Sequence, residues 1–126
     1  TDEEVDRDSV VYVLVESMPV FERECLTLDL DKQDECNKSN FFNYLESIET
    51  PKNTLGKDEK SRGYFSIIVE KDGSIKTIET LRSTGNKKLD KAALKHLKNM
   101  PNFYQAGLQR GKPVRVKYNF PIDFKG

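Results

Sequence analysis

The chain lacks the residue combinations on which most metal, phosphate and catalytic sites depend. Two cysteines and one histidine in 126 residues cannot complete a zinc site. Ser83 and Thr84 precede Gly85 at the start of a helix, but the longer glycine pattern of a phosphate-binding loop is absent. The acidic residues of segment 29–35 lack the central glycine and terminal glutamate of a calcium loop. We therefore expect no metal, no cofactor and no enzymatic activity, and we interpret His96 as a surface or boundary residue.

A long apolar run and a net charge are also absent. No apolar segment is long enough to span a membrane, and the start "TDEEVDRD" is not a signal peptide. The 21 basic and 21 acidic residues cancel, although residues 1–60 hold 16 acidic against 7 basic and residues 61–126 hold 5 against 14. The basic residues are scattered over polar faces without an aromatic platform between them. This distribution favours a solvated surface over nucleic-acid binding.

The second half of the chain carries the clearest periodic patterns. Residues 63–85 predict two strands around Asp72-Gly73, a dipeptide favoured in tight hairpin turns. Residues 86–100 predict an amphipathic helix that Asn86 caps and that Pro101 ends. The predicted core is formed by Phe65, Ile67, Val69, Leu89, Ala93, Leu97, Val116, Tyr118 and Phe120.

The first half is less regular. Residues 1–9 predict a disordered or linker tail, residues 10–21 a strand that runs into a turn at Pro19, and the acidic segment 25–36 a loop. Residues 37–48 predict a helix with Asn37 or Ser39 as its cap, followed by an irregular stretch to residue 62. The order of elements predicts one α+β domain over residues 10–126, with two helices on one face of a small antiparallel sheet. Its two parts are an upstream segment, 10–60, and a core, 63–124.

The last strand carries a proline that favours one of its edges. Apolar and polar residues alternate over 114–124, and Pro121 falls among the polar, odd-numbered positions. Proline lacks a backbone N–H, so Pro121 is tolerated best when its nitrogen faces an unpaired edge. The backbone groups of the odd positions then point to that edge and are free to pair with an incoming strand. The residues predicted to form this binding edge are Arg115, Lys117, Asn119 and Asp123.

A set of short motifs runs through residues 63–124, namely Asp72-Gly73, Ser83 to Gly85, Leu89-Asp90, Ala92-Ala93-Leu94, Pro101, Phe103, Gly111, Pro113-Val114, Pro121-Ile122 and Phe124. Together these residues resemble the C-terminal domain of TonB, the periplasmic energy transducer. The stretch "VESMPVF" and the aromatic helix after it are similar to the upstream segment of TonB-like proteins of the Bacteroidetes type.

The resemblance implies a two-layer TonB/TolA C-terminal-like fold in the periplasm. The implied partners are outer-membrane TonB-dependent transporters, which such domains grip at an N-terminal peptide to drive active transport. A further implied link runs to inner-membrane motor proteins through an anchor that is absent from this chain. Family members carry a Tyr-Pro pair near their receptor contacts, and this chain departs from that pattern with Thr50-Pro51, so the resemblance implies these two residues only as candidate receptor contacts.

The cysteines and the partner leave alternatives open. Cys25 and Cys36 are free thiols in the cytosol and a disulfide in an exported protein, and the periplasmic resemblance implies the disulfide. The alternative functions are a TonB-like sensory or assembly module with another partner, or a small periplasmic ligand-binding domain or enzyme. A homodimer is a further alternative, and no nucleic-acid partner is expected.

Overall fold

The computed structural model describes residues 10–126, so the predicted tail over residues 1–9 lies outside the described part. Its elements are β1 (Val11–Tyr12), the 3-10 helix η1 (Arg23–Thr27), α2 (Leu30–Glu46), β2 (Lys60–Val69), β3 (Ile75–Arg82), α3 (Lys87–Lys98), β4 (Gly107–Gln109) and β5 (Lys112–Lys125). None of the helices within these residues combines the length and the apolar character that crossing a membrane requires.

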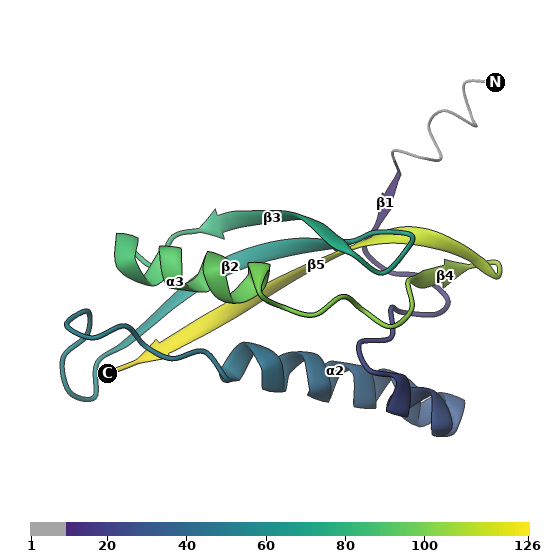
Figure 1. Cartoon of the computed structure of the whole chain (residues 1–126), viewed down its shortest axis with the longest axis horizontal. Coiled ribbons are helices and arrows are strands. Elements are labelled where there is room, and N and C mark those ends of the chain that lie inside the picture. Colours follow the sequence, from purple (N-terminus) through teal and green to yellow (C-terminus); the bar gives the residue numbers. More distant parts are fainter. Residues whose placement is uncertain (1–9) are drawn as a thin grey trace.

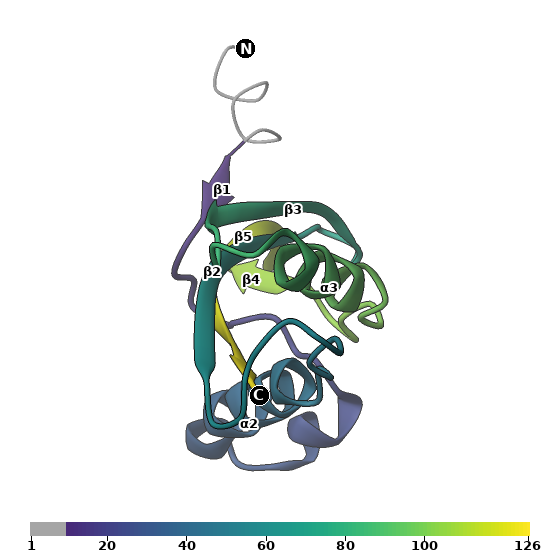
Figure 2. The same cartoon turned by 90° about the vertical axis from the view of Figure 1, so that its left-hand side faces the viewer.

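The strands form one sheet in the order β1-β5-β2-β3, and β4 pairs with the first residues of β5 (Figure 1). The long strands β2, β3 and β5 are antiparallel, whereas β1 runs parallel to β5. Both helices pack on the same face of this sheet (Figure 2). The predicted α+β two-layer class is therefore confirmed, with the difference that the sheet is mixed because of β1.

The β2–β3 hairpin turns at the predicted Asp72-Gly73 pair. Gly73 adopts a φ of 85°, and the Asp72 carboxylate accepts hydrogen bonds from the Ser74 N–H and hydroxyl at 2.9 and 2.6 Å. A side chain at Gly73 would collide with the carbonyl of Phe103, since a Cβ there would lie 2.4 Å from that oxygen. Only glycine combines this backbone conformation with this close approach.

Helix α3 begins where the sequence predicts. The Asn86 side chain accepts hydrogen bonds from the N–H groups of Lys88 and Leu89, at 2.9 and 3.3 Å. The preceding turn is held by Asp90, whose carboxylate accepts hydrogen bonds from the hydroxyl of Ser83 and from the N–H of Thr84. Burial opposes ionisation of Asp90, but these hydrogen bonds outweigh it and lower its pKa.

Helix α2 begins earlier than predicted. It starts at Leu30, with Asp29 at its N-cap, so the predicted caps Asn37 and Ser39 are wrong and lie inside the helix. The predicted loop over residues 25–36 contains η1 and the first turns of α2. Acidic side chains such as Asp31 stabilise the first turn of a helix, and this effect outweighs the weak apolar periodicity here.

Two further segments differ from the prediction. The predicted strand over residues 10–21 is a strand only at Val11–Tyr12, and its later part joins the loop after α3 through isolated bridges from Ser17 to Leu108 and from Val20 to Gln105. That loop contains β4. Pro19 interrupts the upstream segment, so its pairing to the loop is limited to single bridges.

The disulfide between Cys25 and Cys36 is present. It ties η1 to the second turn of α2, and Cys25 is fully buried. This pairing confirms the prediction that followed from the resemblance.

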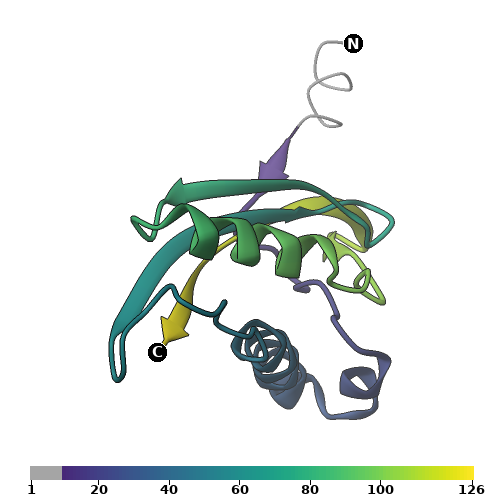
Figure 3. The ribbon, with the colours of Figure 1, turned by 60° about the vertical axis from the view of Figure 1, so that its left-hand side comes forward.

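The core lies between the sheet and the two helices (Figure 3). All the predicted core residues are buried except Tyr118, which is half-buried against the cluster. The aromatic side chains of Phe21 and Phe41, both in the upstream segment, extend this core toward β5. The additional buried residues of the core are Phe21, Phe41, Leu45, Met100, Phe103, Ile122 and Phe124.

The two helices are locked to each other by a reciprocal contact. The Tyr44 hydroxyl of α2 donates to the His96 carbonyl at 2.6 Å, and His96 Nε2 donates to the Tyr44 carbonyl at 2.7 Å. Their rings stack with centroids 4.3 Å apart. His96 is thus a structural residue at the boundary of the fold.

Truncation of Leu97 tests the assignment of the core. Leu97 is 1% exposed in the centre of the α3–sheet contact. We expect Leu97→Ala to lower the free energy of unfolding by about 2–5 kcal/mol, because it removes apolar contacts and leaves a cavity. Urea denaturation measures this value. Leu30→Ala, at a residue that is 84% exposed, is the control and should change the stability by less than about 0.5 kcal/mol.

Reduction of the disulfide tests how the upstream segment is held. The cysteines are 11 residues apart, and closing so short a loop stabilises the folded state by about 3 kcal/mol. We expect reduction to lower the free energy of unfolding by about 3 kcal/mol. It should also increase amide exchange in η1 and the first turns of α2. The amides of β2 should stay protected in the same exchange experiment. If reduction lowered the amide protection of β2 as much as that of η1, the expected local effect of the disulfide would be contradicted.

Candidate functional site

Strand β5 has one fully paired edge and one edge that is largely open. Its residues 116–125 pair with β2 along the whole length of that strand. On the opposite edge, β1 covers only the positions of Arg115 and Val116. Beyond them, no strand within residues 10–126 pairs with the second half of β5.

The register shows which backbone groups point to the open edge. Lys60 lies opposite Lys125, and the next pair outward is hydrogen-bonded, since the Gly126 N–H donates to the Glu59 carbonyl at 2.8 Å. Hydrogen-bonded pairs alternate along an antiparallel ladder, so the even-numbered residues of β5 bond to β2. The odd-numbered residues point away from β2. The Lys125 N–H accordingly donates to the Thr50 hydroxyl, at 3.3 Å.

The open row therefore consists of odd-numbered residues. Asn119 and Asp123 each direct an N–H and a carbonyl to this edge, and Pro121 directs a carbonyl alone. Lys117 adds only its carbonyl to the open row, because the parallel pair Tyr12–Val116 places its N–H against the Tyr12 carbonyl of β1. The ladder to β2 does not use the nitrogen of Pro121, so proline is tolerated within a long strand.

Arg115 departs from the prediction. Its far side is not open, because β1 pairs with it, with Val11 directly opposite. Its side chain binds Glu70 through two hydrogen bonds, of 2.9 and 3.3 Å, and both side chains are largely shielded from solvent. The prediction that the backbone of Arg115 is unpaired is therefore wrong, because β1 forms a parallel strand beside it. Arg115 ties β5 to the hairpin instead.

The other predicted residues lie along or beyond the open row. Asp123 forms an exposed ion pair with Arg62 of β2, with a shortest distance of 2.5 Å. Thr50 lies at the C-terminal end of the row, where its hydroxyl holds Lys125. The carbonyl of Pro51 accepts a hydrogen bond from the Thr54 hydroxyl at 2.6 Å, which fixes the turn after Thr50.

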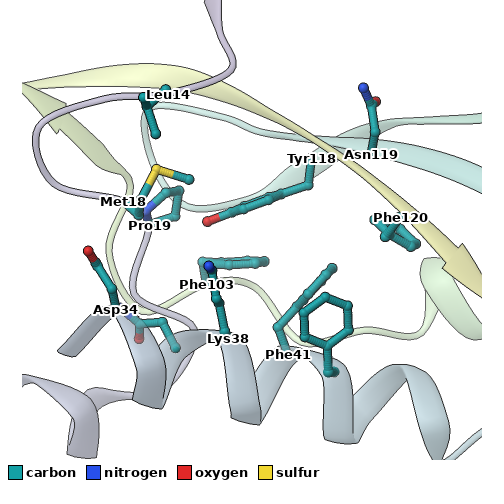
Figure 4. Close-up of a pocket in the computed structure, with 12 residues that line it drawn as sticks. Leu14, Met18, Pro19, Asp34, Lys38, Phe41, Phe103, Tyr118, Asn119 and Phe120 are labelled. Carbon is teal, nitrogen blue, oxygen red and sulfur yellow. The ribbon is translucent and has the colours of Figure 1, made fainter. Parts of the chain in front are cut away.

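A hollow of about 330 Å³ opens beside the row, between β5 and α2. Figure 4 shows the ring of Tyr118 reaching from β5 across this hollow toward Met18 and Pro19, with Phe103 below it. Asp34 and Lys38 of α2 also line it. The walls are mostly apolar side chains, with few polar groups among them.

Phe42 separates this hollow from a second one. It is 43% exposed although it is a large apolar residue, and it lines both hollows. The second hollow, of about 220 Å³, lies between Leu45 of α2 and residues 121–123 of β5. The sequence interpretation did not identify Phe42 as a site residue. The adjacent pair Phe41-Phe42 was the available signal, because neighbouring residues of a helix cannot both face the same core.

The Tyr118 hydroxyl is held in its protonated form. Burial raises the pKa of Tyr118, and the negative charge of Asp34 raises it further. The phenol therefore remains a hydrogen-bond donor in the hollow at any physiological pH.

No group of three or more side chains that could hold a metal ion occurs within residues 10–126. The acidic residues of segment 29–35 form the N-cap and the first turns of α2. The strongest feature for recognition is thus the open edge of β5 with its adjacent hollows.

Comparison with protein families matches residues 57–125 to the family described as Gram-negative bacterial TonB protein C-terminal. This match covers more than half of the chain and includes β2, β3, α3, β4 and β5. Helix α2 and the segment before it lie outside the matched range. A comparison with curated proteins found no match.

Amide hydrogen exchange tests the assignment of the two edges. We expect the amides of Tyr118, Phe120 and Ile122, which donate to β2, to exchange at least about 100-fold more slowly than those of Asn119 and Asp123. NMR-detected exchange measures each amide separately. Uniform protection along 117–122 would mean that the second edge is covered as well.

Proposed function

The chain belongs to the Gram-negative bacterial TonB protein C-terminal family, and on this basis we propose that it binds outer-membrane TonB-dependent transporters by adding their N-terminal peptide to the open edge of β5. Membership of this family makes it a TonB-like periplasmic domain, of a family that binds proteins and is not enzymatic. The transporter as partner and the transfer of work to it are the steps that the proposal adds.

The observation that carries the proposal is the open row on β5. A soluble domain normally covers or blunts such an edge, because unpaired N–H and carbonyl groups invite pairing with other chains. Here the row from the Lys117 carbonyl to Asp123 is unpaired among residues 10–126, while β1 covers the start of the same edge up to the Lys117 N–H. An extended peptide can continue the sheet at this place by strand addition.

The geometry also suits a mechanical link. Hydrogen bonds between strands lie roughly perpendicular to the strand axis, so a pull along that axis loads all of them together. β5 is the longest strand, and most of its other edge is paired with β2. A force on the peptide is thus passed to the most extensively paired strand of the domain. In this proposal an inner-membrane motor supplies the force through a membrane anchor joined to the domain.

Backbone pairing alone gives weak binding. Three or four hydrogen bonds at about 1 kcal/mol net each correspond to a dissociation constant near the millimolar range, before the cost of ordering the peptide. Side-chain contacts must supply the additional affinity. The hollows on either side of Phe42 lie where such contacts can form.

Proline substitution in the open row tests the proposal. Asn119→Pro deletes an N–H that neither β2 nor β1 uses, so the domain should stay folded while strand addition is lost. We expect binding of a synthetic N-terminal peptide of an outer-membrane transporter to become undetectable in Asn119→Pro. Asn119→Ala, the matched control, keeps the N–H and should change the affinity less than about 3-fold.

NMR titration of the labelled domain with the same peptide locates the contact. The amide signals of Asn119 and Asp123 should shift, and circular dichroism should show that both variants are folded. Shifts confined to β3, the strand at the other edge of the sheet, would refute the proposal and place the peptide there.

A further inference from the structure

An added strand would direct every second side chain toward α2. Tyr118, Phe120 and Ile122 face the helices, and cross-strand neighbours on one face lie about 5 Å apart. Peptide residues level with these three would therefore point into the space beside the edge, where α2 and the two hollows lie. This step depends on the proposed function, because it takes the peptide to pair with β5.

The larger hollow contains a buried hydrogen-bond acceptor without a partner. Asn37 of α2 lines it and is 7% exposed, and its Oδ1 has no hydrogen-bond partner among the described residues. A buried polar atom left unpaired destabilises a fold by about 1–3 kcal/mol. An apolar residue of similar shape would avoid this cost. A ligand group that donates a hydrogen bond would satisfy Oδ1.

The walls of the same hollow favour an aromatic ring. Phe41 and Tyr118 stack with centroids 5.5 Å apart, and Phe103 lies 6.1 Å from Tyr118. Aromatic rings pack favourably against such surfaces in offset or edge-on arrangements. The volume of about 330 Å³ is at the low end for a small-molecule site, which suits one side chain of a peptide.

The rim does not favour a charged side chain of either sign. Asp34 and Lys38, one acidic and one basic, both line the hollow. The required occupant is thus neutral, with an aromatic body and a donor near its tip. Tyrosine and tryptophan are the two residues that combine these properties.

We infer that the larger hollow is a specificity pocket that takes a tyrosine or tryptophan of the added strand, whose O–H or N–H donates to Asn37 Oδ1. Phe42 separates this residue from a smaller apolar side chain further along the peptide, which fills the second hollow beside Ile122. Backbone pairing then comes from the family-matched part of the chain. Selection among peptides comes from α2 and residues 14–19, which lie outside that match.

A host–guest peptide series tests the pocket in the oxidised full chain. The host is a short peptide in which threonine alternates with valine, and one valine on the helix-facing side is replaced by tyrosine, phenylalanine or alanine. We expect the tyrosine guest to bind about 5–10-fold more tightly than the phenylalanine guest, because only tyrosine satisfies the buried acceptor. Isothermal titration calorimetry measures the affinities.

Substitution of Asn37 provides the decisive comparison. Asn37→Leu should reduce the tyrosine preference to less than about 2-fold and raise the melting temperature by a few degrees, since it removes an unsatisfied polar group. Asn43→Leu is the matched control on the exposed surface of α2 and should keep the full preference. A melting temperature that falls in Asn37→Leu would show a structural role for the amide and overturn the inference.

A probe without a backbone separates this inference from strand addition. p-Cresol, the side chain of tyrosine, should shift the Asn37 side-chain amide signals in an NMR titration, and toluene should shift them several-fold less. If p-cresol acts in this way but no host peptide binds, strand addition is wrong and the pocket stands. If host peptides bind along β5 but p-cresol and toluene are equivalent, or the tyrosine preference persists in Asn37→Leu, the specificity pocket is refuted and strand addition stands.

Discussion

A residue in a β-strand can bond to one neighbouring strand only, and this constraint on β5 determines the rest of the structure. Its even-numbered residues bond to β2 and place their side chains in the core, whereas the backbone groups of its odd-numbered residues face the other edge. Pro121 fits this division because the ladder to β2 does not need its missing N–H. Any shift of register by one residue would expose the core side chains and place Pro121 against β2. The open row is thus fixed by the same pairing that holds the domain together.

Helix α2 turns this edge into a recognition surface. The disulfide fixes its first half to η1, and the reciprocal contact between Tyr44 and His96 fixes its second half to α3. Held at both ends, α2 keeps Phe42 exposed beside β5 and lines both hollows. A rigid helix beside an open strand reduces the entropy that must be lost when a peptide is ordered there.

The sequence predicts the parts of the fold that depend on local patterns. The hairpin at Asp72-Gly73, the capped helix α3 and the alternating last strand each carry their own signal within a few residues, and the structure confirms them. The start of α2 carries a weak signal and was not predicted. A strand was predicted over residues 10–21, but its short length and its place beside β5 were not, because β1 is two residues long and is defined by its pairing with β5. Pro121 alone indicates which residues of the last strand face the open edge. The hollow at Asn37 could not be predicted from the sequence, since it forms only when α2, β5 and residues 14–19 come together.

The central claim is that a transporter peptide becomes a further strand of the sheet beside β5. Isotope-edited nuclear Overhauser effects between an unlabelled transporter peptide and the labelled domain test this claim most directly. The account predicts backbone contacts from the peptide to the amide protons of Asn119 and Asp123, together with side-chain contacts to the ring of Phe42. Backbone contacts to β3 instead, or side-chain contacts without any backbone contact to β5, would contradict it.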